Sequence, residues 1–279
     1  AAAGALAGVP ADAPVDRGEY IAIDPYVLIT NKKAGNAPTA VPGANISELT
    51  AWLENLDTAV WTPFVIAGDE KTHFASFLLY LAGELVEESS YNDLLSFLSD
   101  SDSLVDEDIL NSYLLLLNPV IDLLQSWKSK GILVFNWTDW DNIAVQQRIL
   151  DGNAAVTFSK RSYYKLLVWT DRVDLTVQRL PTGDNRRNYR MLGDALLLSK
   201  GDGRRSEGFG PIRELLTTSV FQLPIEEATS WTPVILAGPP LNINHRDIVG
   251  WFTNASDYLV FDPGQLEHEL FERLHFQLR

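Results

Sequence analysis

Short apolar runs rich in β-branched and aromatic residues alternate along this chain with segments of helical periodicity. The run Phe64–Ala67, closed by Gly68, is typical of a buried strand, and the segment Thr72–Leu85 after it places its phenylalanines and leucines on one helical face. Such alternation favours layers of helices packed on sheets whose strands pair mainly in parallel. The fold class that the sequence predicts is therefore α/β.

Individual elements follow from the same periodicity and from turn and capping residues. The predicted strands are Tyr20–Thr30 with a bend at Asp24-Pro25, Phe64–Ala67, Ile132–Phe135, Ala154–Phe158, Leu175–Leu180 and Met191–Ser199. The predicted helices are Asn45–Leu56, Thr72–Leu85, Tyr91–Leu98, Ile109–Lys130, Ile143–Leu150, Ser162–Thr170, Pro211–Thr218 and Gln265–Leu278. We expect Asn45 or Ser47 to cap the first helix and Pro119 to bend or break the fourth. The segment Trp61–Gly68 recurs at Trp231–Gly238 with the same Trp-Thr-Pro and Ala-Gly, which we interpret as one loop-to-strand device used twice.

The composition excludes several classes of protein. The chain has 279 residues, 46% of them hydrophobic, which is enough apolar material for one large domain or two lobes. Its net charge of −15 repels phosphate backbones, so we expect no nucleic-acid partner. Cysteine is absent, which removes disulfides and thiolate chemistry, and we find no apolar run long enough to cross a bilayer.

Motifs that would indicate catalysis or a metal site are weak. His268, Glu272 and His275 share one face of the last predicted helix, but we favour a polar surface over a zinc site there. The acidic run Asp100–Asp106 lacks the turn glycine and the ligand spacing of a calcium loop, so we favour a solvated loop. We find no nucleophile, base and orienting group that form a set, and we therefore predict no enzyme, cofactor or metal site.

Aromatic side chains stand beside polar ones in several predicted loops. Trp61 precedes one strand, Asn136–Asp141 follows a second, and Ser159–Tyr164 follows a third. Ligands of open α/β sheets bind beyond the carboxyl ends of the strands, and flat rings with hydrogen-bonding neighbours suit sugars. Core packing is the alternative for each single ring, but the three loops together indicate a cleft for a small polar ligand.

A family resemblance rests on the order of several short segments. These are Tyr20–Lys32, Asn45–Leu49, Thr62–Asp69, Asp151–Val156, Leu180-Pro181 with Leu192–Ala195, and the stretch from Pro211 to Val234. In this order they resemble the extracellular solute-binding proteins of ABC importers, family 1, which mostly bind sugars. Asp151–Val156 is similar to that family's Gly-Lys-Ala-Ala-Met signature. The aromatic residue that the family places after this signature would fall on Ser162, with Tyr163 as the nearest substitute.

The resemblance implies a periplasmic-binding-protein-like fold of type II, with two lobes whose mainly parallel sheets are joined by a hinge. We expect residues 1–18 to be a flexible tether, 19–175 to form the second lobe, and 176–279 to complete the first lobe and supply closing helices. The family's long N-terminal stretch before the first crossover has only this tether in its place. The hinge is predicted at Asp24, Pro25 and Pro181.

The function that the resemblance implies is capture of a small polar ligand, with carbohydrate favoured, for an ABC importer. We predict that the ligand contacts Trp61, His73, Phe74, Asp139, Trp140, Arg161, Tyr163, Tyr189 and Asp194. The expected partners are the ligand and the permease subunits, at the periplasmic side or cell surface, with the membrane reached only through an N-terminal lipid anchor. The alternatives are an interaction or scaffold protein that kept this fold without transport and, third, a secreted hydrolase.

Overall fold

The computed structural model describes residues 9–10, 18–34, 45–99, 106–166, 174–182, 190–199, 209–216, 218–234, 243–254, 257–261 and 263–279. The chain divides into two compact units. Unit 1 takes in the described residues of Ala1–Tyr26, Lys160–Val168 and Asn188–Phe261, and unit 2 those of Val27–Ser159, Trp169–Arg187 and Asp262–Arg279. The points at which the chain passes from one unit to the other differ from the predicted lobe boundaries of 19–175 and 176–279.

The sheet of unit 1 is built on the first part of β2 (Gly18–Asn31). β6 (Arg190–Ser199) runs antiparallel to β2 from Gly18 to Pro25, and β7 (Thr232–Pro233) pairs antiparallel with β2 at Ala22 and Ile23. β8 (Asp257–Leu259) lies parallel to β6 and antiparallel to β1 (Val9–Pro10). Most of the predicted tether lies outside the described residues, but Val9 and Pro10, which belong to it, form β1.

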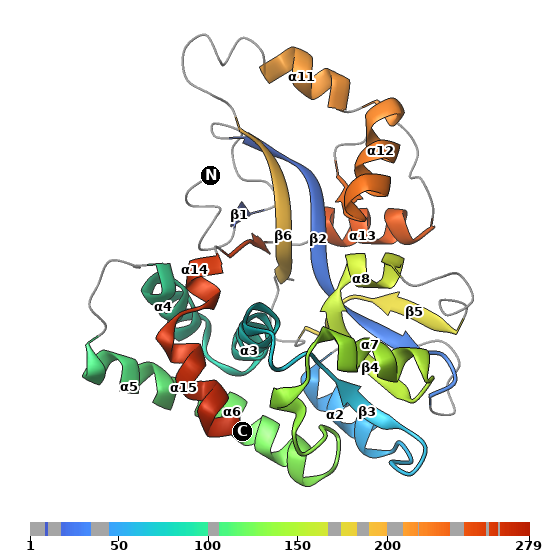
Figure 1. Ribbon diagram of the computed structural model, residues 1–279. Helices are drawn as coiled ribbons and strands as arrows, with labels where there is room; N and C mark the ends of the chain where they lie inside the picture. The colour runs from blue at the N-terminus through green and yellow to red at the C-terminus, as the bar shows by residue number, and fades with distance from the viewer. Residues whose placement is uncertain are drawn as a thin grey trace. The chain divides into compact units, whose positions relative to one another are not determined.

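Four helices of unit 1 are α8 (Arg161–Leu166), α11 (Phe209–Leu216), α12 (Ser219–Thr229) and α13 (Ile243–Asn254) (Figure 1). Ile248 of α13 packs on Ile23 of β2 and Met191 of β6, and all three side chains are almost fully buried. Burial of such apolar side chains is the main favourable contribution to folding. The core of unit 1 therefore lies between its sheet and α13.

The strands of unit 2 are the rest of β2, β3 (Thr62–Val65), β4 (Ala154–Lys160, of which Lys160 is assigned to unit 1) and β5 (Leu175–Gln178). β3 and β4 are parallel, and β5 is antiparallel to β2. The helices are α2 (Ile46–Glu54), α3 (Lys71–Leu85), α4 (Glu88–Ser99), α5 (Glu107–Leu116), α6 (Asn118–Ser129), the 3-10 helix η1 (Trp137–Asp139), α7 (Asn142–Leu150), α14 (Pro263–Leu266) and α15 (Glu269–Leu278).

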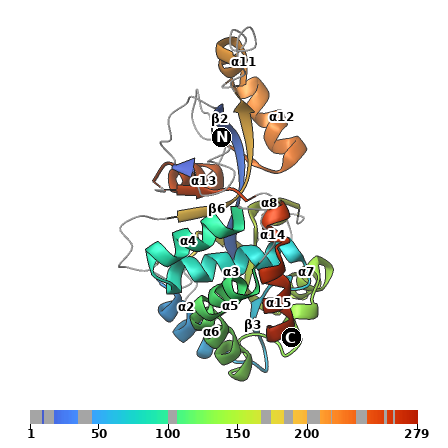
Figure 2. The same cartoon turned by 90° about the vertical axis from the view of Figure 1, so that its left-hand side faces the viewer.

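Helix α3 is the central element of unit 2. Its residues His73–Gly83 are all buried, as expected for a helix that is apolar around most of its circumference. Figure 2 shows α3 with α4, α5, α6 and α15 around it. Its Phe77 contacts Phe64 of β3 and Phe158 of β4, with ring centroids 5.5 Å and 5.0 Å apart. This aromatic cluster joins the helical layer to the strands.

Three sequence-based expectations are wrong. The sheets are mixed rather than mainly parallel, because β2 pairs antiparallel with β5, β6 and β7. Ile132–Phe135 forms no strand, since the amides of Ile132 and Leu133 both donate to the carbonyl of Trp127 at the end of α6. β2 is continuous through Asp24-Pro25, and its irregularity lies between Tyr20 and Ala22 instead.

The predicted C-terminal helix is two helices, α14 and α15, separated by Glu267 and His268. His268 has an extended backbone and caps α15, with Nδ1 accepting from the amide of Leu270 at 3.1 Å. It therefore does not continue the helical face of Glu272 and His275. Within the described segments, no group of three or more metal-ligating side chains lies together, and no helix is long and apolar enough to cross a membrane.

Candidate ligand-binding site

A cavity of about 160 Å³ opens in unit 2 where the loop after β3 meets the C-terminal helices. The loop and the start of α3 supply Asp69, Lys71 and Phe74. The C-terminal helices and the turn between them supply Leu266, Glu267, Phe271, Glu272 and His275. The cavity therefore combines an apolar interior with charged groups, at the carboxyl end of a strand where ligands of α/β proteins commonly bind.

Gly68 lets the loop after β3 approach η1 closely. A Cβ atom at this position would lie 2.5 Å from the carbonyl oxygen of Trp137 and 2.8 Å from Cα of Thr138. The next amide, that of Asp69, donates to the carbonyl of Trp140 at 3.0 Å. Only glycine leaves room for this backbone contact, which fixes the start of the loop at the rim of the cavity.

The floor of the cavity is aromatic. The ring of Phe74 is 2% exposed, lies stacked against Trp137 at 5.8 Å, and meets His275 edge-on at 5.0 Å. Phe271 of α15 is also buried and lines the same cavity. These two buried aromatic side chains make this part of the cavity lining apolar.

His275 presents a defined nitrogen beside this floor. Its Nε2 lies 3.1 Å from the carbonyl oxygen of Thr138, and a carbonyl can only accept. Nε2 therefore carries the proton and donates. In the neutral ring, Nδ1 is then the nitrogen that accepts a hydrogen bond.

The rim of the cavity carries one ion pair and two further carboxylates. Lys71 Nζ lies 2.9 Å from Glu272 Oε1, and this hydrogen bond raises the pKa of Lys71 and lowers that of Glu272. Both side chains are more than half exposed, so the pair adds little to stability. The carboxylates of Asp69 and Glu267 form no hydrogen bond or ion pair with another described side chain. They remain available to a ligand.

Comparison with solved structures identifies the architecture that carries this cavity. A chitin oligosaccharide binding protein matches with a TM-score of 0.58 at 13% identity, over 94% of this chain and 70% of that one. The bacterial solute receptor AcbH, with its exclusive preference for b-D-galactopyranose, matches with a TM-score of 0.66 at 12% identity, over 94% and 67%. A "probable secreted solute-binding lipoprotein" from Streptomyces coelicolor matches with a TM-score of 0.58 at 10% identity, over 91% and 63%.

This chain has the solute-binding-protein fold. The predicted resemblance is thus confirmed at the level of the fold. No family model matches the sequence, and no curated protein matches it either. The chain spans about two thirds of the length of these solute-binding proteins.

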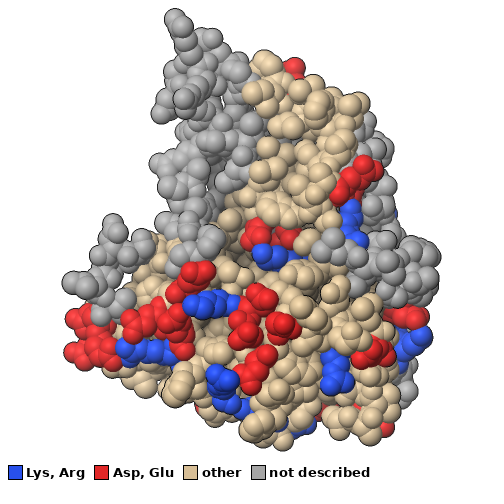
Figure 3. Space-filling model, viewed as in Figure 1, with Lys and Arg blue, Asp and Glu red and all other residues tan. Residues whose placement is uncertain are grey.

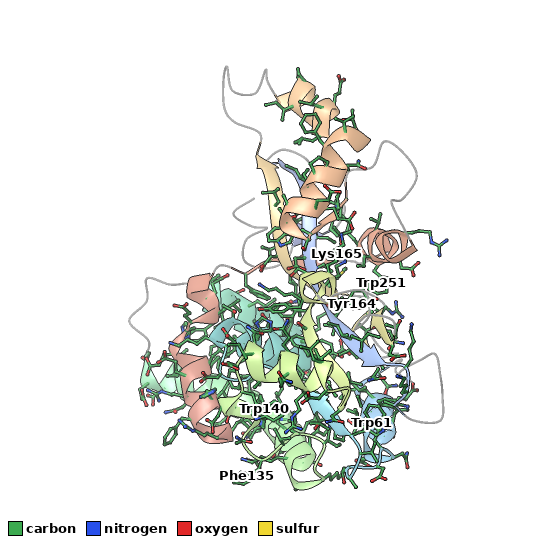
Figure 4. The ribbon with its side chains drawn as sticks, turned by 45° about the vertical axis from the view of Figure 1, so that its right-hand side comes forward. Trp61, Phe135, Trp140, Tyr164, Lys165 and Trp251 are labelled. Carbon is green, nitrogen blue, oxygen red and sulfur yellow. The ribbon has the colours of Figure 1, made fainter. Side chains whose placement is uncertain are left out.

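Of the ligand contacts predicted for unit 2, only Phe74 lines the cavity. His73 is buried beside it in α3, and Asp139 pairs with Arg279 at 3.1 Å. Trp140 packs on an apolar cluster of β3, β4 and α7, with the guanidinium of Arg148 5.5 Å from its ring. Figure 4 shows Trp140 near α7 and Trp61 near β3. Neither side chain lines the cavity, although the carbonyl of Trp140 accepts from the amide of Asp69 at its rim.

Arg161, one of the contacts predicted for unit 1, belongs to a network of largely buried charges. Arg161 is 2% exposed and donates to the carbonyl of Ser230 at 2.9 Å and to Glu226 Oε1 at 3.3 Å. Burial opposes ionisation of Glu226, but hydrogen bonds and charges from Lys165 and Arg161 outweigh it and lower its pKa. The guanidinium of Arg161 therefore serves an internal ion pair, and its contact with a ligand stays a prediction.

Two more predicted contacts and the predicted hinge residues also have defined surroundings. Asp194 accepts from Lys160 Nζ at 2.6 Å, and Tyr163 is half-buried on α8. Pro181 accepts a hydrogen bond from the hydroxyl of Tyr80 at 2.6 Å in unit 2, whereas Asp24 and Pro25 lie inside β2. Tyr189 lies outside the described residues.

Sequence reasoning missed most of the cavity. Asp69 and Lys71 lie in the same loop and helix start as the predicted contacts His73 and Phe74, shortly after the strand. Phe271, Glu272 and His275 come from the C-terminal helix, which returns to unit 2 after the chain has passed through unit 1. No local sequence signal reports such a return.

Proposed function

We propose that this protein is an extracytoplasmic solute-binding protein that captures a carbohydrate for an ABC importer, and that the cavity of unit 2 holds one part of the ligand. The observation that carries the proposal is the aromatic floor of Phe74 and Phe271 with charged groups and a histidine acceptor around it. The solute-binding-protein fold supports the same conclusion, because one matched protein is named for the chitin oligosaccharides that it binds and another is described by its preference for b-D-galactopyranose.

The chemistry of the cavity suits a sugar ring. The C–H face of a pyranose stacks on aromatic rings, and its hydroxyls need both donors and acceptors. Asp69 supplies acceptors and Lys71 supplies a donor, and we propose that Nδ1 of His275 is a further acceptor. At about 160 Å³ the cavity is smaller than the roughly 300–1,000 Å³ of a complete small-molecule site, so we propose further contacts from other residues.

The wider setting belongs to the same proposal. We place the protein outside the cytoplasmic membrane, with permease subunits as its macromolecular partners and with a lipid anchor as one means of retention. One matched protein is named as a secreted lipoprotein, which supports this location. Bending at Asp24, Pro25 and Pro181 would accompany ligand capture, as in hinge closure generally.

Binding of an oligosaccharide panel to the purified protein, measured by titration calorimetry, tests the function. Phe271→Ala should weaken binding of the preferred sugar about 10- to 100-fold, the scale of a buried ring lost from a ligand site. Phe276→Ala is the matched control, because Phe276 lies on the same helix, is 84% exposed and does not line the cavity.

A second variant separates binding from folding. Because Phe271 is buried, its replacement also removes core packing. A loss of affinity is attributed to the binding site only if circular dichroism shows that the variant is folded. Asp69→Ala changes an exposed side chain and should also weaken binding while the melting temperature stays unchanged. Absence of binding across the panel would contradict the function, and unaltered affinity in both variants would exclude this cavity.

A further inference from the structure

The charges around the cavity do not cancel. Three carboxylates line it, those of Asp69, Glu267 and Glu272, against one ammonium group, that of Lys71. Lys71 is already paired with Glu272, which leaves Asp69 and Glu267 without a bonded cation among the described side chains. Figure 3 shows acidic side chains gathered on the face of unit 2 that carries α14 and α15. The lining of the cavity thus carries a surplus of negative charge.

This surplus discriminates between classes of sugar. An acidic sugar would be repelled, and a neutral sugar would leave the two carboxylates without a charged partner. A sugar that carries a protonated amine would place its ammonium group near them and form charge-assisted hydrogen bonds.

We infer that the cavity of unit 2 prefers an amino sugar with a free, protonated amine over a neutral sugar of the same size. The inference rests on the proposed function and specifies its substrate class. Asp69 and Glu267 are the residues that set the preference. Lys71 is hydrogen-bonded to Glu272, and its charge also acts on Glu267, so it offsets only part of the negative charge.

Three tetrasaccharides with the same β-1,4 backbone test the inference. They carry at carbon 2 a hydroxyl group (cellotetraose), an acetamido group (tetra-N-acetylchitotetraose) or a free amine (chitosan tetramer). Calorimetry at low salt and about pH 6, where ordinary carboxyl groups are ionised, should show the amine compound binding at least about fivefold tighter than cellotetraose. The preference should weaken at about 300 mM salt, which screens exposed charges.

Variants connect the preference to the residues. The double variant Asp69→Asn, Glu267→Gln should lower the affinity ratio between the amine compound and cellotetraose to about one, since the surplus charge is gone. Glu269→Gln is the matched control. Glu269 lies two residues after Glu267 in the sequence, but it pairs with Arg273 and does not line the cavity. It should keep the wild-type ratio.

The outcomes of this experiment and of the sugar panel can be told apart. Equal or tighter binding of cellotetraose overturns the preference and leaves the carbohydrate-binding function in place. A preference that survives in the double variant overturns the assignment to Asp69 and Glu267. If none of the three compounds binds, the inference fails, and the sugar panel decides the function on its own.

Discussion

The carboxyl group of Asp24 is buried in unit 1 and nevertheless well provided with hydrogen bonds. It accepts from the backbone amide of Ser162 at 2.8 Å and from its hydroxyl at 2.6 Å. Burial raises the pKa of Asp24 to about 6, although these bonds and the charge of Lys160 act in the opposite direction, and Asp194 adds to the rise. The folded protein therefore retains a proton that the unfolded chain releases.

The elevated pKa makes stability depend on pH in a defined direction. Between about pH 4 and pH 6 the folded state binds more protons at Asp24 than the unfolded state, so the free energy of unfolding falls as the pH rises. Across this range Asp24 lowers the free energy of unfolding by an amount on the order of 3 kcal/mol, since one pKa unit corresponds to about 1.4 kcal/mol. Urea denaturation across this range should show a decline in wild type that Asp24→Asn lacks.

A control separates this effect from simple removal of a charge. Asp151→Asn removes an exposed carboxylate in unit 2 and should follow the wild-type pH profile. If the profiles of wild type and Asp24→Asn run parallel, Asp24 does not hold the proton.

At the scale of elements, the junction between the β3–α3 loop and η1 depends on a residue without a side chain. Gly68→Ala would drive a methyl group into the backbone at Trp137 and Thr138, and backbone cannot rotate away as a side chain can. We expect a loss of about 1–3 kcal/mol in the free energy of unfolding, typical of overpacking, and weaker sugar binding because Asp69 follows directly.

Gly83→Ala in α3 provides the comparison. A Cβ atom there would lie 3.4 Å from the ring of Tyr91, an ordinary contact, and alanine favours the helix by up to about 1 kcal/mol. Denaturation and calorimetry on both variants should show opposite signs of the stability change. Equal stability of Gly68→Ala and wild type would refute the close approach.

Elements with strong local signals could be predicted from the sequence. Asn45 caps α2 through a bond from the amide of Glu48 at 2.9 Å, as a short polar side chain before an apolar stripe predicts. Pro119 lies in the first turn of α6, and the predicted break separates α5 from α6 at Leu117. Gly152 ends α7 with φ of +72°, a conformation that favours glycine.

Elements that depend on distant partners could not be predicted in this way. The apolar run at Ile132 has the composition of a strand, yet its amides bond to the end of α6, which periodicity does not reveal. The antiparallel pairing of β2 with β6 joins residues more than 160 positions apart. For the same reason Phe74, which follows a predicted strand, was within reach of sequence analysis as a residue of the cavity, whereas Phe271 of the C-terminal helix was not.

At the scale of the whole molecule, a net charge of −15 favours expansion of the chain through self-repulsion. Ion pairs such as Lys71–Glu272 and Arg246–Asp247 are largely exposed and weak. Salt that screens the overall repulsion therefore removes little attraction from such pairs. We expect the melting temperature at pH 7 to rise as sodium chloride increases from about 10 mM to about 300 mM.

The same titration has an internal control. Near pH 4.6, the isoelectric point of the sequence, the net charge vanishes and the salt effect should shrink. A melting temperature that falls with salt at pH 7 would mean that local attraction outweighs the net repulsion.

Strand β2 belongs to both units, and this has a consequence for measurement. Its amides and carbonyls up to Pro25 pair with β6 and β7 of unit 1, whereas those from Leu28 onward pair with β5 of unit 2. In hydrogen–deuterium exchange followed by mass spectrometry, one peptide from this strand of 14 residues would carry amides of both units. Separate opening of the two units would then appear as two uptake rates within a single fragment, with the change of rate at Tyr26.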